Sequence, residues 1–102
     1  MFVGVLRLTF HVAHARTLKD KRRVVQRFRD RVRSRFEVWI AEVDAQDKLQ
    51  RAVFGVAVVS SDARVCDSVL EQVARAAETQ EDATLTDRQT EVVTFGDDLH
   101  GR

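Results

Sequence analysis

Three acidic residues, Glu42, Asp44 and Asp47, lie within six positions of one another and are the first candidates for chemistry. Carboxylate oxygens at such spacing could bind a hard cation. Acids on a polar connector are more often solvated, however. The three histidines do not indicate a metal site, because they show neither the HxH nor the HExxH spacing of such sites. We therefore predict no metal site.

Signals of nucleophilic or cofactor chemistry are equally weak. Cys66 is the single cysteine and falls at an apolar helix position with no base nearby in the sequence, which is typical of a buried, inert thiol. The four glycines form neither a GxxxxGK[ST] nor a GxGxxG phosphate-binding string. We predict no catalytic residue and no cofactor, and an enzyme that uses Asp44 and Asp47 beside Lys19 ranks last among our hypotheses.

Basic residues are concentrated in the first third of the chain. Residues 1–36 contain 11 Lys and Arg against two acids, whereas residues 37–102 contain six basic and 14 acidic residues. Such segregation favours a surface for an anionic partner, or two opposite patches that pair between copies. The candidate residues for binding RNA or another anion are Arg16, Lys19, Lys21, Arg22, Arg23 and Arg27.

Hydrophobic periodicity predicts the elements that must position these residues. The segment Phe2–Val12 alternates with period two, as a strand with its even-numbered residues in the core. Apolar residues between Leu18 and Arg35 recur at helical spacing, which indicates an amphipathic helix with an arginine-rich outer face. The remaining predicted elements are strands at 36–43, 52–60 and 90–95, and a helix that begins after the Ser61-Asp62 cap and ends near Glu78.

The order β-α-β-β-α-β predicts an α+β fold, the ferredoxin-like sandwich of a four-stranded antiparallel sheet with two helices on one face. We expect one domain, residues 1–95, followed by a flexible tail, residues 96–102. In this topology the first and second strands run parallel, so the loops that follow them lie at the same end of the sheet. The start of the first helix should therefore face the connector after the second strand.

The residues expected on that facing connector are Glu42, Asp44, Gln46, Asp47 and Arg51. Cations at a helix N-terminus are disfavoured by the helix dipole, so something must offset the basic residues there. One alternative is an ion-pair network with the acids of the connector. The other is an anion, such as phosphate, bound at the free backbone N–H groups. The sequence leaves both open.

Two strings carry a family resemblance. LKDKRR at residues 18–23 and AEVDAQDKLQRA at residues 41–52 resemble the YlxP-like family of small bacterial proteins. The resemblance implies a ferredoxin-like fold without an established biochemical activity. It also implies a setting in bacterial RNA and ribosome metabolism.

The open face of the predicted sheet is apolar. Val3, Val5, Trp39, Ala41 and Val43 should share it, and soluble monomers rarely leave such a patch bare. Either a tail or connector folds across the patch, or it is an interface, and we favour a homodimer. Base stacking on this face is not expected, because Phe2 has the parity of the core.

Two hypotheses follow for function. The first is a non-enzymatic accessory protein that contacts RNA or ribosomal subunits through its basic first helix. The second is an oligomeric regulatory or protein-binding domain that uses the open sheet face. The longest uncharged stretches fall far short of the roughly 18 apolar residues of a membrane span, so we expect a cytoplasmic protein without a membrane partner.

Overall fold

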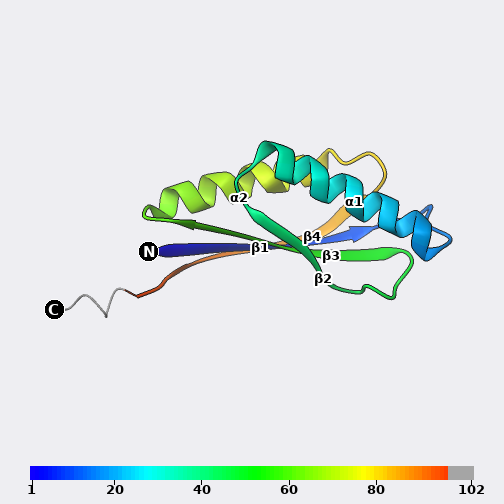
Figure 1. The fold of residues 1–102 in the computed structure, drawn as a ribbon, viewed down its shortest axis with the longest axis horizontal. Coiled ribbons are helices and arrows are strands. Elements are labelled where there is room, and N and C mark those ends of the chain that lie inside the picture. Colours follow the sequence, from blue (N-terminus) through cyan, green and yellow to red (C-terminus); the bar gives the residue numbers. More distant parts are fainter. Residues whose placement is uncertain (97–102) are drawn as a thin grey trace.

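The computed structural model describes residues 1–96, and they form the expected ferredoxin-like fold (Figure 1). The elements are β1 (Phe2–His11), α1 (Leu18–Arg35), β2 (Trp39–Asp44), β3 (Arg51–Ser60), α2 (Ala63–Glu78) and β4 (Thr84–Thr94). The strands pair antiparallel in the order β2-β3-β1-β4, and both helices lie on the same side of the sheet. The fold class predicted from the sequence is confirmed.

The beginning of α1 is fixed by a capping box. The Thr17 hydroxyl accepts a hydrogen bond from the Asp20 backbone N–H, and the Asp20 carboxylate accepts one from the Thr17 N–H. This arrangement satisfies two N–H groups that the first turn of a helix leaves free. The buried positions of α1 are Lys21, Val25, Phe28 and Val32.

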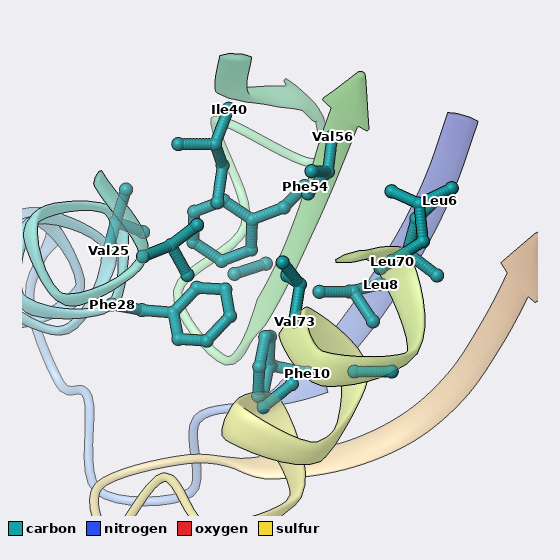
Figure 2. Close-up of a cluster of buried hydrophobic side chains, with 14 of the residues drawn as sticks. Leu6, Leu8, Phe10, Val25, Phe28, Ile40, Phe54, Val56, Leu70 and Val73 are labelled. Carbon is teal, nitrogen blue, oxygen red and sulfur yellow. The ribbon is translucent and has the colours of Figure 1, made fainter. Parts of the chain in front are cut away.

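The centre of the core is a group of three phenylalanines, one each from β1, α1 and β3 (Figure 2). The Phe28 ring centroid lies 4.9 Å from that of Phe10 and 5.0 Å from that of Phe54. Leu70 and Val73 of α2 cover the same layer, and both are fully buried. This apolar layer holds the two helices on the sheet and leaves the opposite sheet face uncovered by residues 1–96.

Helix α2 lies close against β1 at Gly4. A Cβ atom added there would lie 2.8 Å from Leu70 Cδ1 and 3.0 Å from Cys66 Cβ. The missing side chain therefore lets α2 pack directly on the strand. Cys66, on the face of α2 that contacts the sheet, is buried as the sequence indicated.

Strand β4 begins at Thr84, six positions before the predicted start at Thr90. Its first half pairs with the end of β1, with Leu85 opposite Phe10 and Thr84 opposite His11. Because β4 is an edge strand, most of its side chains are exposed and polar, so the apolar alternation that marks a buried strand is missing.

The predicted tail, residues 96–102, lies outside the described residues except for Gly96. Within residues 1–96, no helix is long and apolar enough to span a membrane.

Candidate functional site

Two loops meet at the end of the sheet where β1 and β2 finish, the right-hand end of Figure 1. The Val12 backbone N–H donates to the Gln50 carbonyl at 2.9 Å. The Gln50 side-chain amide in turn donates to the Ala13 carbonyl at 3.1 Å. We call this region, residues 12–23 and 42–51, the loop end.

Lys21 lies at the centre of the loop end and is only 2% exposed. Its ammonium group lies 3.0 Å from the Glu42 carboxylate and donates a hydrogen bond to the Ala45 carbonyl. Ala45 has a φ of 58°, in the left-handed region. From the sequence, Lys21 was expected among the surface cations. The structure places it inside instead, because it lies one helical turn before Val25 on the core face of α1.

The other acidic residues of the loop end do not neutralise the surface cations. Asp44 accepts a hydrogen bond from the adjacent Ala45 N–H, and Asp47 is exposed. Gln46 is exposed too, and its side-chain amide donates to the Glu42 carbonyl at 3.5 Å. Within residues 1–96, the predicted ion-pair network is thus reduced to the contact between Lys21 and Glu42.

Asp20 also forms its hydrogen bonds with backbone N–H groups and not with the cationic side chains. Its carboxylate accepts hydrogen bonds from the Arg16 and Thr17 N–H groups at 3.0 and 3.2 Å. The bond from Arg16 is the main cause of a lowered pKa for Asp20, and the charge of Arg23 contributes to it. A carboxylate at this place offsets part of the unfavourable interaction between the helix dipole and the basic residues.

Three of the later arginines of α1 have partners within the molecule. Arg27 forms an ion pair with Asp82 at 2.9 Å. Arg31 donates to the Ala76 carbonyl at 3.1 Å and so helps to cap the C-terminus of α2. The Arg33 guanidinium stacks on the Trp39 ring, 5.3 Å from its centroid. The helix face that the sequence suggested as one continuous basic surface is therefore divided.

Six exposed cations lie at the loop end, and none of them forms an ion pair within residues 1–96. One shallow groove, of about 370 Å³, is lined by Lys19, Arg22, Arg23 and Gln26 together with Arg27. A second, of about 740 Å³, lies between the two loops. We call the set the loop-end cations: Arg16, Lys19, Arg22, Arg23, Lys48 and Arg51.

The open sheet face is the second candidate surface. Trp39 is 67% exposed, Val43 53% and Val5 42%, while Val3 and Ala41 are half-buried. Val59 and Val93 extend the patch. A hollow of about 790 Å³ lies above Gly55 and Ala57, between Trp39 on one side and β4 on the other.

Within residues 1–96, no three His, Cys, Asp or Glu side chains gather in a way that could hold a metal ion.

The described features define a small ferredoxin-like α+β domain with cations gathered at one end and an apolar open sheet face. The model of a family described as "Protein of unknown function (DUF503)" matches residues 3–90, and the chain belongs to this family.

The chain is also similar to the "Uncharacterized protein YlxP" of Bacillus subtilis (strain 168), with 42% identity over 59 residues. The match covers 58% of this chain and 64% of that relative's length. The resemblance to the YlxP-like family is thereby confirmed. Among solved structures, a de novo designed protein with a ferredoxin fold matches with a TM-score of 0.53 and 17% identity, over 95% of this chain and 89% of that one. This likeness concerns the fold alone.

Proposed function

We propose that this protein binds RNA, free or within ribosomal particles, through the loop-end cations. The observation that supports the proposal is the contrast along α1. Arg27, Arg31 and Arg33 have partners within the molecule, whereas Lys19, Arg22 and Arg23 form no ion pair within residues 1–96. Like charges that crowd together repel each other, and phosphate contacts turn that repulsion into affinity.

The charge arrangement favours the RNA backbone over base recognition. The loop-end cations are arginines and lysines on the first turns of a helix and on a neighbouring loop, which suits phosphate contacts. Trp39 is an exposed aromatic residue of the open sheet face, and Arg33 already stacks on it. Binding should therefore be strongly dependent on salt and weakly dependent on sequence.

The test is fluorescence anisotropy of a labelled single-stranded RNA, titrated with protein at several salt concentrations. For single strands the logarithm of the binding constant falls by about 0.7 per phosphate contact for each decade of salt. The variant Arg22→Glu/Arg23→Glu should lose affinity and show a slope lower by about one to two. The matched control is Arg64→Glu/Arg75→Glu, which changes the net charge equally on α2. Equal loss in both variants, or no loss in the first, contradicts the proposal.

A second candidate function is self-association through the open sheet face. The observation in its favour is the exposure of Trp39, Val43 and Val59 on one surface, each more than half accessible. Contiguous apolar surface of this kind marks interfaces. Light scattering tests it, since a mass of 11.7 kDa throughout the micromolar range would show a monomer.

A further inference from the structure

The open sheet face is built from rows of residues that run across all four strands. One row, from β2 to β4, is Trp39, Ala57, Val5 and Glu91. The next row toward the loop end is Ala41, Gly55, Arg7 and Gln89. The first row begins with an aromatic ring at the β2 edge and ends with a carboxylate at the β4 edge.

The two edges of this face carry opposite charge. At the β2 edge, Arg33 lies against Trp39 and also reaches the Ile40 carbonyl, at 3.5 Å. At the β4 edge, Asp87 and Glu91 are exposed, and neither forms an ion pair within residues 1–96. Antiparallel strands lie about 4.8 Å apart, so the Cα atoms of Trp39 and Glu91 are separated by about 14 Å. This distance prevents the two edges from neutralising each other within one molecule.

We propose that a second copy of this chain packs on the open face about a two-fold axis parallel to the strands. The inference rests on the self-association proposed above and assigns its geometry. Rotation about such an axis places each row opposite the same row of the partner copy, with its order reversed. Strand β2 then lies over β4 of the partner copy.

This reversal brings the oppositely charged edges of the two copies together. Arg33 and Trp39 face the partner's Glu91, so a cation meets a carboxylate that has no ion pair within residues 1–96. In the next row, Gly55 faces the partner's Arg7, the longest side chain of that row. Val43 fills the space directly over Gly55, so this arginine would enter the rest of the hollow, beside Ala57. Packed sheets lie about 10 Å apart and their side chains interdigitate, which requires this kind of complementarity.

The other symmetric arrangement is disfavoured by the same charges. An axis perpendicular to the strands would place β4 over β4 of the partner copy, which brings Asp87 and Glu91 close to the same acids. Juxtaposed like charges oppose association. The parallel axis also preserves strand direction, so the loop ends of both copies lie at the same end of the dimer. Their cations would then form one continuous surface.

The test is a charge exchange followed by sedimentation equilibrium. Glu91→Arg and Arg33→Glu should each weaken dimerisation by about tenfold or more, and the combined variant Arg33→Glu/Glu91→Arg should restore most of the loss. The matched control exchanges two exposed residues away from the face, Arg35→Glu/Glu81→Arg, and should leave dimerisation unchanged. Circular dichroism verifies that each variant is folded.

The outcomes separate the geometry from self-association itself. If Trp39→Glu yields monomers while the Arg33 and Glu91 variants dimerise as the parent does, the open face is the interface but the proposed axis is wrong. A tighter dimer for Glu91→Gln would show that β4 faces β4 of the partner copy, which also overturns the axis. A parent protein that stays at 11.7 kDa in the micromolar range overturns both proposals.

Discussion

Replacing Lys21 with Met removes a charge that the fold has buried and should destabilise the protein by about 3 kcal/mol. The lysine side chain is 2% exposed and the Glu42 side chain 18%, with the two charged groups 3.0 Å apart. Loss of one partner of a fully buried pair costs about 3–5 kcal/mol, because the other charge stays buried without compensation. The residual exposure of Glu42 places the expected cost at the lower end. For a domain of this size, that corresponds to a fall in melting temperature of about 12–24 °C.

Urea and thermal unfolding, followed by circular dichroism, measure this cost. Adding Glu42→Gln to the Lys21→Met variant should recover about half of it, since no charge is then left unpaired. Lys19→Met, at an exposed position of the same turn, is the control and should change stability by about 0.5 kcal/mol or less. A Lys21→Met variant within about 1 kcal/mol of the parent, or single and double variants whose effects simply add, would refute the role assigned to the buried pair.

Gly4→Ala should destabilise the protein by about 1–3 kcal/mol in urea unfolding, because the new methyl group pushes α2 away from β1. An unchanged midpoint of the urea transition would show that α2 can shift there without cost. Arg31→Met should lower the free energy of unfolding by about 1–2 kcal/mol, because its hydrogen bonds to the C-terminus of α2 are lost. Arg35→Met, at an exposed position, is the control and should be nearly neutral. Equal effects of the two variants in the same unfolding assay would contradict this. The pKa of Asp20 is lowered by the Arg16 backbone N–H, and that of Asp62 by its hydrogen bonds from Arg64. Because both pKa values are lower in the folded state than the ordinary 3.8, their stabilising contribution is present above that pH and is lost as the pH falls through the folded values. In acid titrations the variant Asp20→Asn/Asp62→Asn should therefore lose less stability than the parent, and parallel curves would count against the lowered pKa values.

Much of the architecture could be predicted because the signals are local. The alternation in β1 and the helical spacing in α1 each have one dominant period, and α1 begins and ends at the predicted residues. The meeting of the two loops follows from the parallel course of β1 and β2. The early start of β4 could not be predicted, because an exposed edge strand is held by backbone hydrogen bonds, which any side chain permits.

The candidate surface was harder to predict, because charge alone does not reveal which cations have partners. The burial of Lys21 could have been predicted, since it occupies the position one turn before Val25 on the buried face of α1. The partners of Arg27 and Arg31 come from the end of α2 and the segment after it, about 45 to 55 residues further along the chain. Such distant contacts have no trace in the local pattern.

The hydrogen bonds that join the two loops affect the entropy of any binding event at the loop end. Thr17 caps the helix, Gln50 holds the Ala13 carbonyl and Lys21 holds the Ala45 carbonyl, so the backbone that carries the cations is ordered in advance. An incoming anion then immobilises side chains only, at about 0.5–1.5 kcal/mol each, instead of about 1–2 kcal/mol for every backbone residue of a loop that must fold. Binding of an anion at the loop end should accordingly leave the heat capacity nearly constant, unlike the large negative change in heat capacity that accompanies folding on binding.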